Sequence, residues 1–154
     1  MVSWSEFAAA APALARAGAD LLATGDGHVL LVSVRAAELP RVHPVTVAVV
    51  GRGLYVFVID ASPKRVDLDQ DGRYALHTWL DRQRPHEFSL RGRAVRVDDP
   101  ARRAEVARGW SFTVDDDYGL YELGIASALL GVRDSPDEWP PRYTSWKAPA
   151  RPNT

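Results

Sequence analysis

The tripeptide Ser62-Pro63-Lys64 is the strongest candidate for chemistry in this sequence, because it joins an apolar β-branched run to a short helix-forming segment. The first turn of a helix presents free backbone N–H groups and a partial positive charge. The Ser62 hydroxyl adds a hydrogen-bonding group and Lys64 adds a full charge, so the turn suits a phosphate. The alternative is that Ser62 only caps the helix and Lys64 is a solvated cation.

A second candidate is the segment Leu39-Pro40-Arg41-Val42-His43-Pro44-Val45, in which a proline lies inside a β-forming run. Because Pro44 has no N–H, it cannot donate to a sheet ladder, and we expect an edge or irregular strand. Backbone groups without a strand partner could contact a flat heterocycle there. The alternative is a plain edge strand that leads into the core.

Several other chemistries are disfavoured by composition and spacing. No cysteine is present, which excludes disulfides, thiolate nucleophiles and cysteine-ligated metals. The four histidines lack metal-ligand spacing, and the run Asp115-Asp116-Asp117 lacks the later ligands of a calcium loop. Ser62 does not lie in a nucleophile elbow. We therefore predict no metal site and no hydrolytic nucleophile.

The charge balance argues against polyanionic partners. The chain has 19 basic and 20 acidic residues and a net charge of -1, which provides no overall field for nucleic acid or an anionic membrane. The N-terminus lacks the pattern of a secretory signal, and no stretch approaches the roughly 18 apolar residues of a membrane span. We expect a cytoplasmic protein with no nucleic-acid or membrane partner.

The elements that would position the candidate residues are mostly strands. Short β-branched runs predict strands over the ranges His28–Val34, Val42–Val50, Leu54–Ile59, Tyr74–Trp79 and Glu87–Val97. Five strands in about 70 residues indicate a closed sheet.

Three further segments are predicted around these strands. The two glycines of Gly51-Arg52-Gly53 can adopt a positive φ, which predicts a tight antiparallel hairpin. The range Tyr121–Val132 is interpreted as a strand, although its Ala and Leu content also fits a helix. The range Arg142–Lys147 alternates like a closing strand.

An N-terminal helical segment over 1–22 is predicted to cover the barrel as a lid. Ser3 and Glu6 fit a capping box, and the Ala-rich helix from Phe7 to Leu22 should be interrupted near Pro12 or Gly18.

Two shorter helices are expected. One or two helical turns follow Pro63 and end at Gly72, and Asp99-Pro100 opens a helix over Ala101–Arg108. One domain over 1–154 is expected, with a loose tail at 148–154.

Taken in order, the sequence resembles the pyridoxamine 5'-phosphate oxidase-like family of the flavin- and deazaflavin-binding split β-barrel superfamily, over about residues 22 to 97. The motifs that carry the resemblance are Leu22-Ala23-Thr24, Leu39-Pro40-Arg41-Val42-His43-Pro44-Val45, Gly53-Leu54-Tyr55-Val56-Phe57-Val58, Ser62-Pro63-Lys64-Arg65-Val66-Asp67-Leu68, Arg73-Tyr74-Ala75-Leu76-His77 and Leu90-Arg91-Gly92-Arg93-Ala94. The resemblance implies a mainly β fold with a few flanking helices. It further implies a homodimer of six-stranded antiparallel split barrels with cofactor sites at the subunit interface.

The resemblance also implies which residues bind the cofactor. Arg41 and Lys64 would neutralise its phosphate with help from Ser62, and backbone groups of the two adjoining strands would face the ring. The expected cofactor-binding residues are Arg41, Val42, His43, Pro44, Val45, Val58, Ile59, Ser62, Pro63, Lys64, Glu87 and Trp146. No catalytic side chain is expected, since the cofactor itself performs hydride transfer.

The implied function is an oxidoreductase that uses FMN or a deazaflavin coenzyme on a small-molecule substrate. Pyridoxamine phosphate oxidation itself is not expected, because Phe57 and Val58 replace the tyrosine-threonine pair of the true oxidases and their C-terminal arginine segment has no counterpart. Glu87 replaces a glutamine, and an ionised carboxylate cannot donate to a ring carbonyl. The alternatives are a non-catalytic barrel that stores or senses flavin or holds haem through a histidine, and a cofactor-free interaction module.

Overall fold

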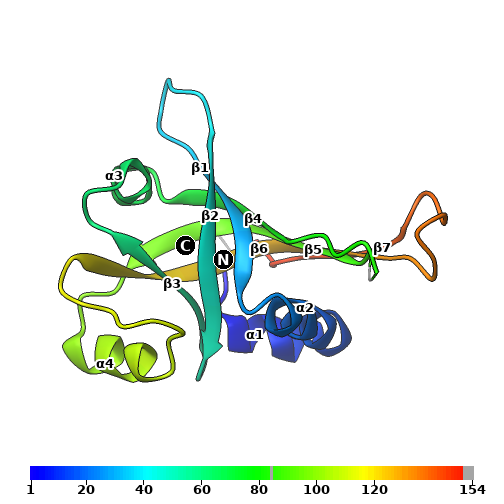
Figure 1. Ribbon diagram of the computed structural model, residues 1–154, viewed down its shortest axis with the longest axis horizontal. Coiled ribbons are helices and arrows are strands. Elements are labelled where there is room, and N and C mark those ends of the chain that lie inside the picture. Colours follow the sequence, from blue (N-terminus) through cyan, green and yellow to red (C-terminus); the bar gives the residue numbers. More distant parts are fainter. Residues whose placement is uncertain (84, 151–154) are drawn as a thin grey trace.

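The structure, a computed structural model, describes residues 1–83 and 85–150. This part of the chain contains four helices and seven strands (Figure 1). The helices are α1 (Trp4–Ala10), α2 (Pro12–Thr24), α3 (Pro63–Gln70) and α4 (Pro100–Arg108). The strands are β1 (His28–Ser33), β2 (Arg41–Val50), β3 (Gly53–Ile59), β4 (Arg73–Thr78), β5 (Glu87–Arg96), β6 (Tyr118–Val132) and β7 (Arg142–Lys147).

The strands form one antiparallel sheet in the order β3-β2-β1-β4-β5-β6-β7. β6 also pairs with β3, so the first six strands in this order close into a barrel and β7 lies outside the ring. The length of β6 makes this possible, because residues 118–122 pair with β3 and residues 127–132 pair with β7. The predicted mainly β fold with a six-stranded antiparallel barrel is confirmed.

The hairpin between β2 and β3 forms as predicted, although only one of its glycines needs a positive φ. Gly51 has a φ of 55°, a conformation that is favourable for glycine. Gly53 instead provides space, because a Cβ atom there would lie 2.5 Å from the ring of Tyr55.

The two strands predicted in the last third of the chain are confirmed. They are β6 and β7.

A bulge between β5 and β6 lets these two long strands approach closely. The pairing register shifts between Arg91 and Gly92. A Cβ atom on Gly92 would lie 1.8 Å from the Gly124 carbonyl oxygen, so a larger residue could not occupy this position. Bulges of this kind increase the local twist that a closed barrel requires.

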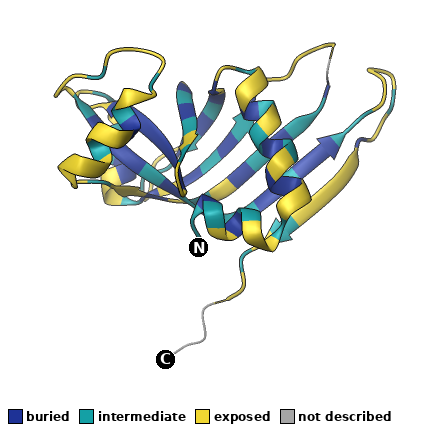
Figure 2. Ribbon diagram, turned by 90° about the horizontal axis from the view of Figure 1, so that it is seen from below, coloured by how far each residue is buried: buried dark blue, intermediate teal, exposed yellow. Residues whose placement is uncertain are grey.

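The N-terminal helices lie across one face of the sheet (Figure 2). The predicted capping box is present, since the Glu6 N–H donates to the Ser3 hydroxyl and the Ser3 N–H donates to the Glu6 carboxylate. The helix breaks at Pro12 and continues through Gly18. Gly18 serves packing instead, because a Cβ atom there would lie 2.4 Å from the Phe88 ring.

Two apolar clusters stabilise the fold. The larger one fills the barrel interior and extends beneath α1 and α2. The smaller one lies between α4 and the outer side of β3 and β6, and contains Tyr55, Phe57, Val106 and Leu120.

The C-terminal tail was predicted to be loose over residues 148–154. Of these residues, 151–154 lie outside the described part of the chain. The Ala148 N–H donates to the Ala126 carbonyl at 2.9 Å, so the chain is still attached to β6 there.

Candidate functional site

The barrel wall opens where β2 and β3 diverge. β2 pairs with β3 only over residues 47–50, and its residues 41–46 pair with β1 alone. Residues 57–59 of β3 pair with β6 alone. Each strand therefore leaves one backbone edge without a strand partner on the side of the split. The segment around Pro44 is the predicted edge strand, and its free backbone groups can bond to a ligand.

A tight turn connects the end of β3 to α3, at the end of the barrel where the split lies (Figure 1). The Ser62 hydroxyl donates to the Ile59 carbonyl at 2.8 Å, and the Ser62 N–H donates to the same carbonyl at 3.0 Å. The Ser62 side chain makes no cap hydrogen bond to α3. Capping by the Ser62 side chain is therefore wrong; the Ser62 carbonyl accepts the Arg65 N–H at 3.1 Å, and the hydroxyl satisfies no N–H group of the first helical turn.

Lys64 is a cation without a partner at the start of α3. Its side chain is half-buried. Within residues 1–83 and 85–150 it takes part in no hydrogen bond or ion pair. Burial lowers the pKa of its ammonium group, because the charged form loses solvation. A bound anion would compensate for this lost solvation.

Asp67, on the inner side of α3, gathers the other charged groups of this region. It is fully buried. Its carboxylate accepts hydrogen bonds from the Ser33 hydroxyl at 2.7 Å, from Arg35 Nε at 2.9 Å and from Arg41 Nη1 at 2.9 and 3.0 Å. Burial alone would raise the pKa of Asp67, but these hydrogen bonds outweigh it and hold the pKa below its ordinary value. The group is therefore a carboxylate at neutral pH.

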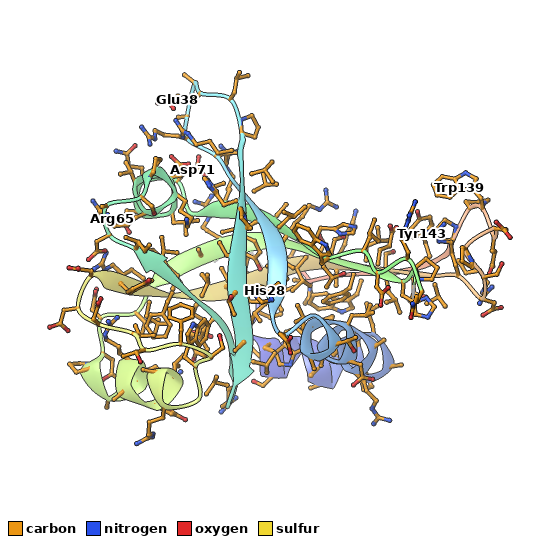
Figure 3. All side chains as sticks on the ribbon, in the orientation of Figure 1. His28, Glu38, Arg65, Asp71, Trp139 and Tyr143 are labelled. Carbon is orange, nitrogen blue, oxygen red and sulfur yellow. The ribbon has the colours of Figure 1, made fainter. Side chains whose placement is uncertain are left out.

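Arg41 lies between two acidic groups. Its Nη1 contacts Asp67, and its Nη2 donates to Glu38 on the loop between β1 and β2. Figure 3 shows Glu38 at the top of this hairpin, above α3. The hydrogen bond to Glu38 is the largest cause that raises the pKa of Arg41, and the hydrogen bond to Asp67 is the second. The resemblance implies that Arg41 binds phosphate, but its guanidinium is already paired inside the chain.

His43 is held neutral beside this cluster. Because the Ser33 hydroxyl donates to Asp67, its oxygen accepts from His43 Nε2 at 3.1 Å, which assigns the ring proton to Nε2. Burial, followed by repulsion from Lys64, lowers the pKa of His43. With the imidazole neutral, Arg35 and Arg41 balance the carboxylates of Glu38 and Asp67, which they contact. The nearby charge of Lys64, which interacts with His43, is not compensated by either carboxylate.

Comparisons with known proteins were made at the level of sequence and of structure. No family model matches the sequence, and no curated protein matches it. A haem binding protein from Mycobacterium smegmatis superimposes with a TM-score of 0.63 at 16% identity, over 84% of this chain and 56% of that one. A NimC/NimA family protein from Clostridium acetobutylicum gives 0.63 at 15% identity, over 86% and 92%.

A protein of the pyridoxinephosphate oxidase family from Clostridium acetobutylicum superimposes with a TM-score of 0.62 at 12% identity, over 85% of this chain and 92% of the other. The chain has the pyridoxamine 5'-phosphate oxidase-like split-barrel fold. The chain spans just over half of the mycobacterial protein and nearly all of the two clostridial ones.

The split barrel separates the expected cofactor-binding residues into two groups. Residues 41–45, 58–59 and 62–64 lie together around the split, and Glu87 and Trp146 belong to β5 and β7. Trp146 packs against Phe7 of α1, with ring centroids 5.0 Å apart. Glu87 accepts a hydrogen bond from Tyr143, which Figure 3 shows at the opposite end of the molecule from Arg65 of α3. One chain of this split barrel therefore does not bring the two groups together.

Sequence reasoning missed the acidic centre of the site. Asp67, Ser33 and Arg35 were assigned no role, yet they hold Arg41 in place. A signal for Ser33 was present, because Val29, Leu31 and Ser33 alternate along β1 and all point into the barrel. Ser33 continues this row of inward-pointing side chains, and a hydroxyl buried inside the barrel needs a hydrogen-bond partner there.

The described residues were also searched for a metal site and for a membrane-spanning helix. No group of three or more His, Asp or Glu side chains there could hold a metal ion. No helix within 1–83 and 85–150 is long and apolar enough to cross a bilayer.

Proposed function

We propose that this protein is a cytoplasmic oxidoreductase that binds FMN or a deazaflavin coenzyme by its phosphate at the start of α3. The observation that carries the proposal is Lys64, a half-buried cation without a partner among the described residues, beside a helix start that the Ser62 side chain does not cap. Unpaired cations and free helical N–H groups are the standard means of binding phosphate. The bound cofactor would supply hydride transfer.

The residues around the split fit such a cofactor. Lys64 would hold the phosphate through its ammonium group and its backbone N–H, because Pro63 has no N–H and the Arg65 N–H already donates to the Ser62 carbonyl. The open backbone edges at 42–45 and 58–59 would bond to polar atoms of the ring. Arg41 would contribute mainly by holding Asp67 and α3 in place, because its charge is already compensated.

A homodimer would complete this site. Glu87 and Trp146, which the resemblance assigns to the cofactor, belong to β5 and β7, and Figure 1 shows β7 on the opposite side of the molecule from α3, which carries Lys64. A second copy could place its own β5 and β7 near the split of the first. If the protein is a monomer in solution and still binds the cofactor at micromolar concentration, the dimeric part of the proposal is wrong.

The absorption spectrum of the purified protein, followed by titration with FMN and with a deazaflavin coenzyme, tests the proposal. We expect saturable binding of one of the two, with an affinity that falls at least tenfold in Lys64→Ala. Arg16 is an exposed cation of α2, so Arg16→Ala is the matched control and should bind like the wild type. Failure of both cofactors to bind at micromolar concentration would leave the interaction module as the better account.

A haem-binding protein is the second candidate, because one structure with this fold is described as a haem binding protein. His77 is the best placed ligand. Its Nδ1 donates to the Thr78 carbonyl at 2.7 Å, which leaves the lone pair on Nε2; this nitrogen lies 3.8 Å from the Glu87 carboxylate on a partly exposed side chain. A Soret band that is lost in His77→Ala and kept in His28→Ala would favour haem over flavin.

A further inference from the structure

Glu38, on the loop between β1 and β2, is an exposed carboxylate that contacts two of the cations around α3. Its Oε1 lies 3.2 Å from Arg35 Nη1, and its Oε2 accepts a hydrogen bond from Arg41 Nη2. The Glu38 side chain is 41% exposed and the Arg41 side chain is 32% exposed. An exposed ion pair of this kind contributes little to stability, because water solvates both groups when they separate.

The two contacts of Arg41 differ in burial. Its Nη1 donates to both carboxylate oxygens of Asp67, at 2.9 and 3.0 Å, and Asp67 is fully buried. Breaking that contact would leave a buried carboxylate short of a donor, which is costly. Breaking the contact between Nη2 and Glu38 would leave both groups in water. The Glu38 contact is therefore the one that a ligand can replace.

Arg41 lies beside Lys64 along one face of α3. Lys64 and Asp67 are three positions apart on this helix, and residues with that spacing are neighbours on a helix surface. Arg41 contacts Asp67, so its guanidinium lies next to the same face. His43 reports both charges, because after burial, the largest cause, Lys64 and Arg41 each lower the pKa of its imidazole. For a phosphate beside Lys64, Arg41 is therefore a second cation within the same region.

Lys64 alone does not neutralise a phosphate monoester. Such a group carries about 1.5 to 2 negative charges at pH 7, and Lys64 supplies one positive charge. Glu38 and Asp67 balance the charges of Arg35 and Arg41, and the Glu38 carboxylate would also repel the phosphate. Movement of Glu38 away from Arg41 would provide the missing positive charge and remove this repulsion.

We propose that Glu38 holds the place of a phosphate oxygen on Arg41 in the cofactor-free protein, and that the phosphate of the bound cofactor displaces it. This inference rests on the proposed function. Arg41 keeps Asp67 throughout, so α3 stays in place, and the Glu38 carboxylate keeps Arg35 as its partner. Glu38 is thus a specificity-determining residue that sets the affinity for the phosphate group and leaves the affinity for the ring unchanged.

Titration of FMN and of riboflavin into the wild type and Glu38→Gln tests the exchange. Glutamine keeps the size and one acceptor oxygen of the side chain but removes its charge. We expect the affinity for FMN to rise about fivefold in Glu38→Gln, with the affinity for riboflavin unchanged. If the wild type binds only a deazaflavin, 5-deaza-FMN and 5-deazariboflavin replace the two probes.

Glu105→Gln is the matched control. Glu105 is an exposed acid of α4 that forms an ion pair with Arg102 three positions before it, as Glu38 does with Arg35. Figure 1 shows α4 and α3 at different ends of the barrel. Glu105→Gln removes the same charge from the protein and should bind FMN like the wild type.

The same titration in Arg41→Gln, with and without Glu38→Gln, distinguishes exchange at Arg41 from general repulsion. If Glu38 acts through Arg41, its replacement should no longer improve FMN binding once Arg41 is absent. Backbone amide signals of residues 35–41 in NMR spectra should shift with FMN more than with riboflavin. A circular dichroism melt confirms that each variant is folded.

The outcomes separate this inference from the proposed function. Equal or weaker FMN binding by Glu38→Gln overturns the exchange and leaves the cofactor site intact. A gain that persists in Arg41→Gln also overturns it. If neither FMN nor the deazaflavin binds the wild type, the proposed function fails and the exchange fails with it.

Discussion

The end of the barrel near α3 and the outer face of β5, β6 and β7 are both rich in cations, and they differ in whether the chain supplies its own anion. Around α3, the guanidinium groups of Arg35 and Arg41 donate hydrogen bonds to the carboxylates of Asp67 and Glu38. On the outer face of β5, the only bond of the Arg91 side chain within the described residues is to the Ser127 hydroxyl. A cation with an internal carboxylate holds the fold together, whereas one without it is available to a ligand. Lys64 lies beside the first region but belongs to the second class.

The largest effect is expected from removing the acid of the first region. Asp67→Asn leaves Arg35 and Arg41 beside a neutral amide, and breaking a buried ion pair in this way costs about 3–5 kcal/mol of unfolding free energy. Urea unfolding followed by circular dichroism measures the loss. Asp116→Asn, at an exposed loop position, is the control and should change stability by less than about 0.5 kcal/mol. A stable Asp67→Asn protein would show that the cluster is not structural.

A smaller effect is expected from Arg41→Ala. Asp67 keeps Ser33 and Arg35 as donors, so the loss should be near the value of one charged hydrogen bond, about 1.5–3 kcal/mol. The same unfolding measurement applies.

In contrast, Lys64→Ala should change the free energy of unfolding by no more than about 0.5 kcal/mol, since Lys64 has no partner among the described residues to lose. Equal losses in the two variants would erase the distinction between the regions.

Acid should weaken the first region in a predictable direction. The folded pKa of Asp67 lies below its unfolded value of about 3.9, so the unfolded chain binds more protons between the two values. Its contribution to stability is therefore complete above about pH 5 and declines as the pH falls through the unfolded and then the folded pKa. Unfolding midpoints measured from pH 7 to pH 3 should decline less steeply in Asp67→Asn than in the wild type. Parallel profiles would contradict this assignment.

The smallest effect concerns the reactivity of Lys64. The sequence contains only two lysines, so Lys147 in the same molecule serves as the reference. Burial lowers the pKa of Lys64, and labelling with an amine-directed anhydride should give it an apparent pKa below the usual value of about 10.4. Peptide mass spectrometry across a pH series reads both sites. Bound FMN should protect Lys64 from the reagent.

The order of elements could be predicted from the sequence because its local signals agree. The alternation of β-branched residues, the Ser3 capping box and the Asp99 cap each correspond to an observed element. The number of strands predicted a closed sheet, but the closure of β6 onto β3 depends on contacts between distant residues and was found only in the structure. Pro12 and Gly18 were both candidates for a helix break; the break lies at Pro12, which starts α2, and Gly18 instead allows close packing against Phe88.

The candidate site was predicted only in part, for a physical reason. Ser62 and Lys64 are neighbours in sequence, so their combination was visible. The partner of Arg41 is Asp67, which is 26 positions away, and one sequence does not show that β2 and α3 bring these two side chains together. The paired state of Arg41 could therefore be found only in the structure.

The most direct test of the phosphate site is a comparison of FMN with riboflavin, which has the same ring without the phosphate. In the wild type we predict that FMN binds at least tenfold more tightly than riboflavin, a difference of about 1.4 kcal/mol. In Lys64→Ala that preference should vanish, through loss of FMN affinity with riboflavin affinity unchanged. A preference for FMN that persists in Lys64→Ala, or equal binding of both compounds to the wild type, would contradict the account.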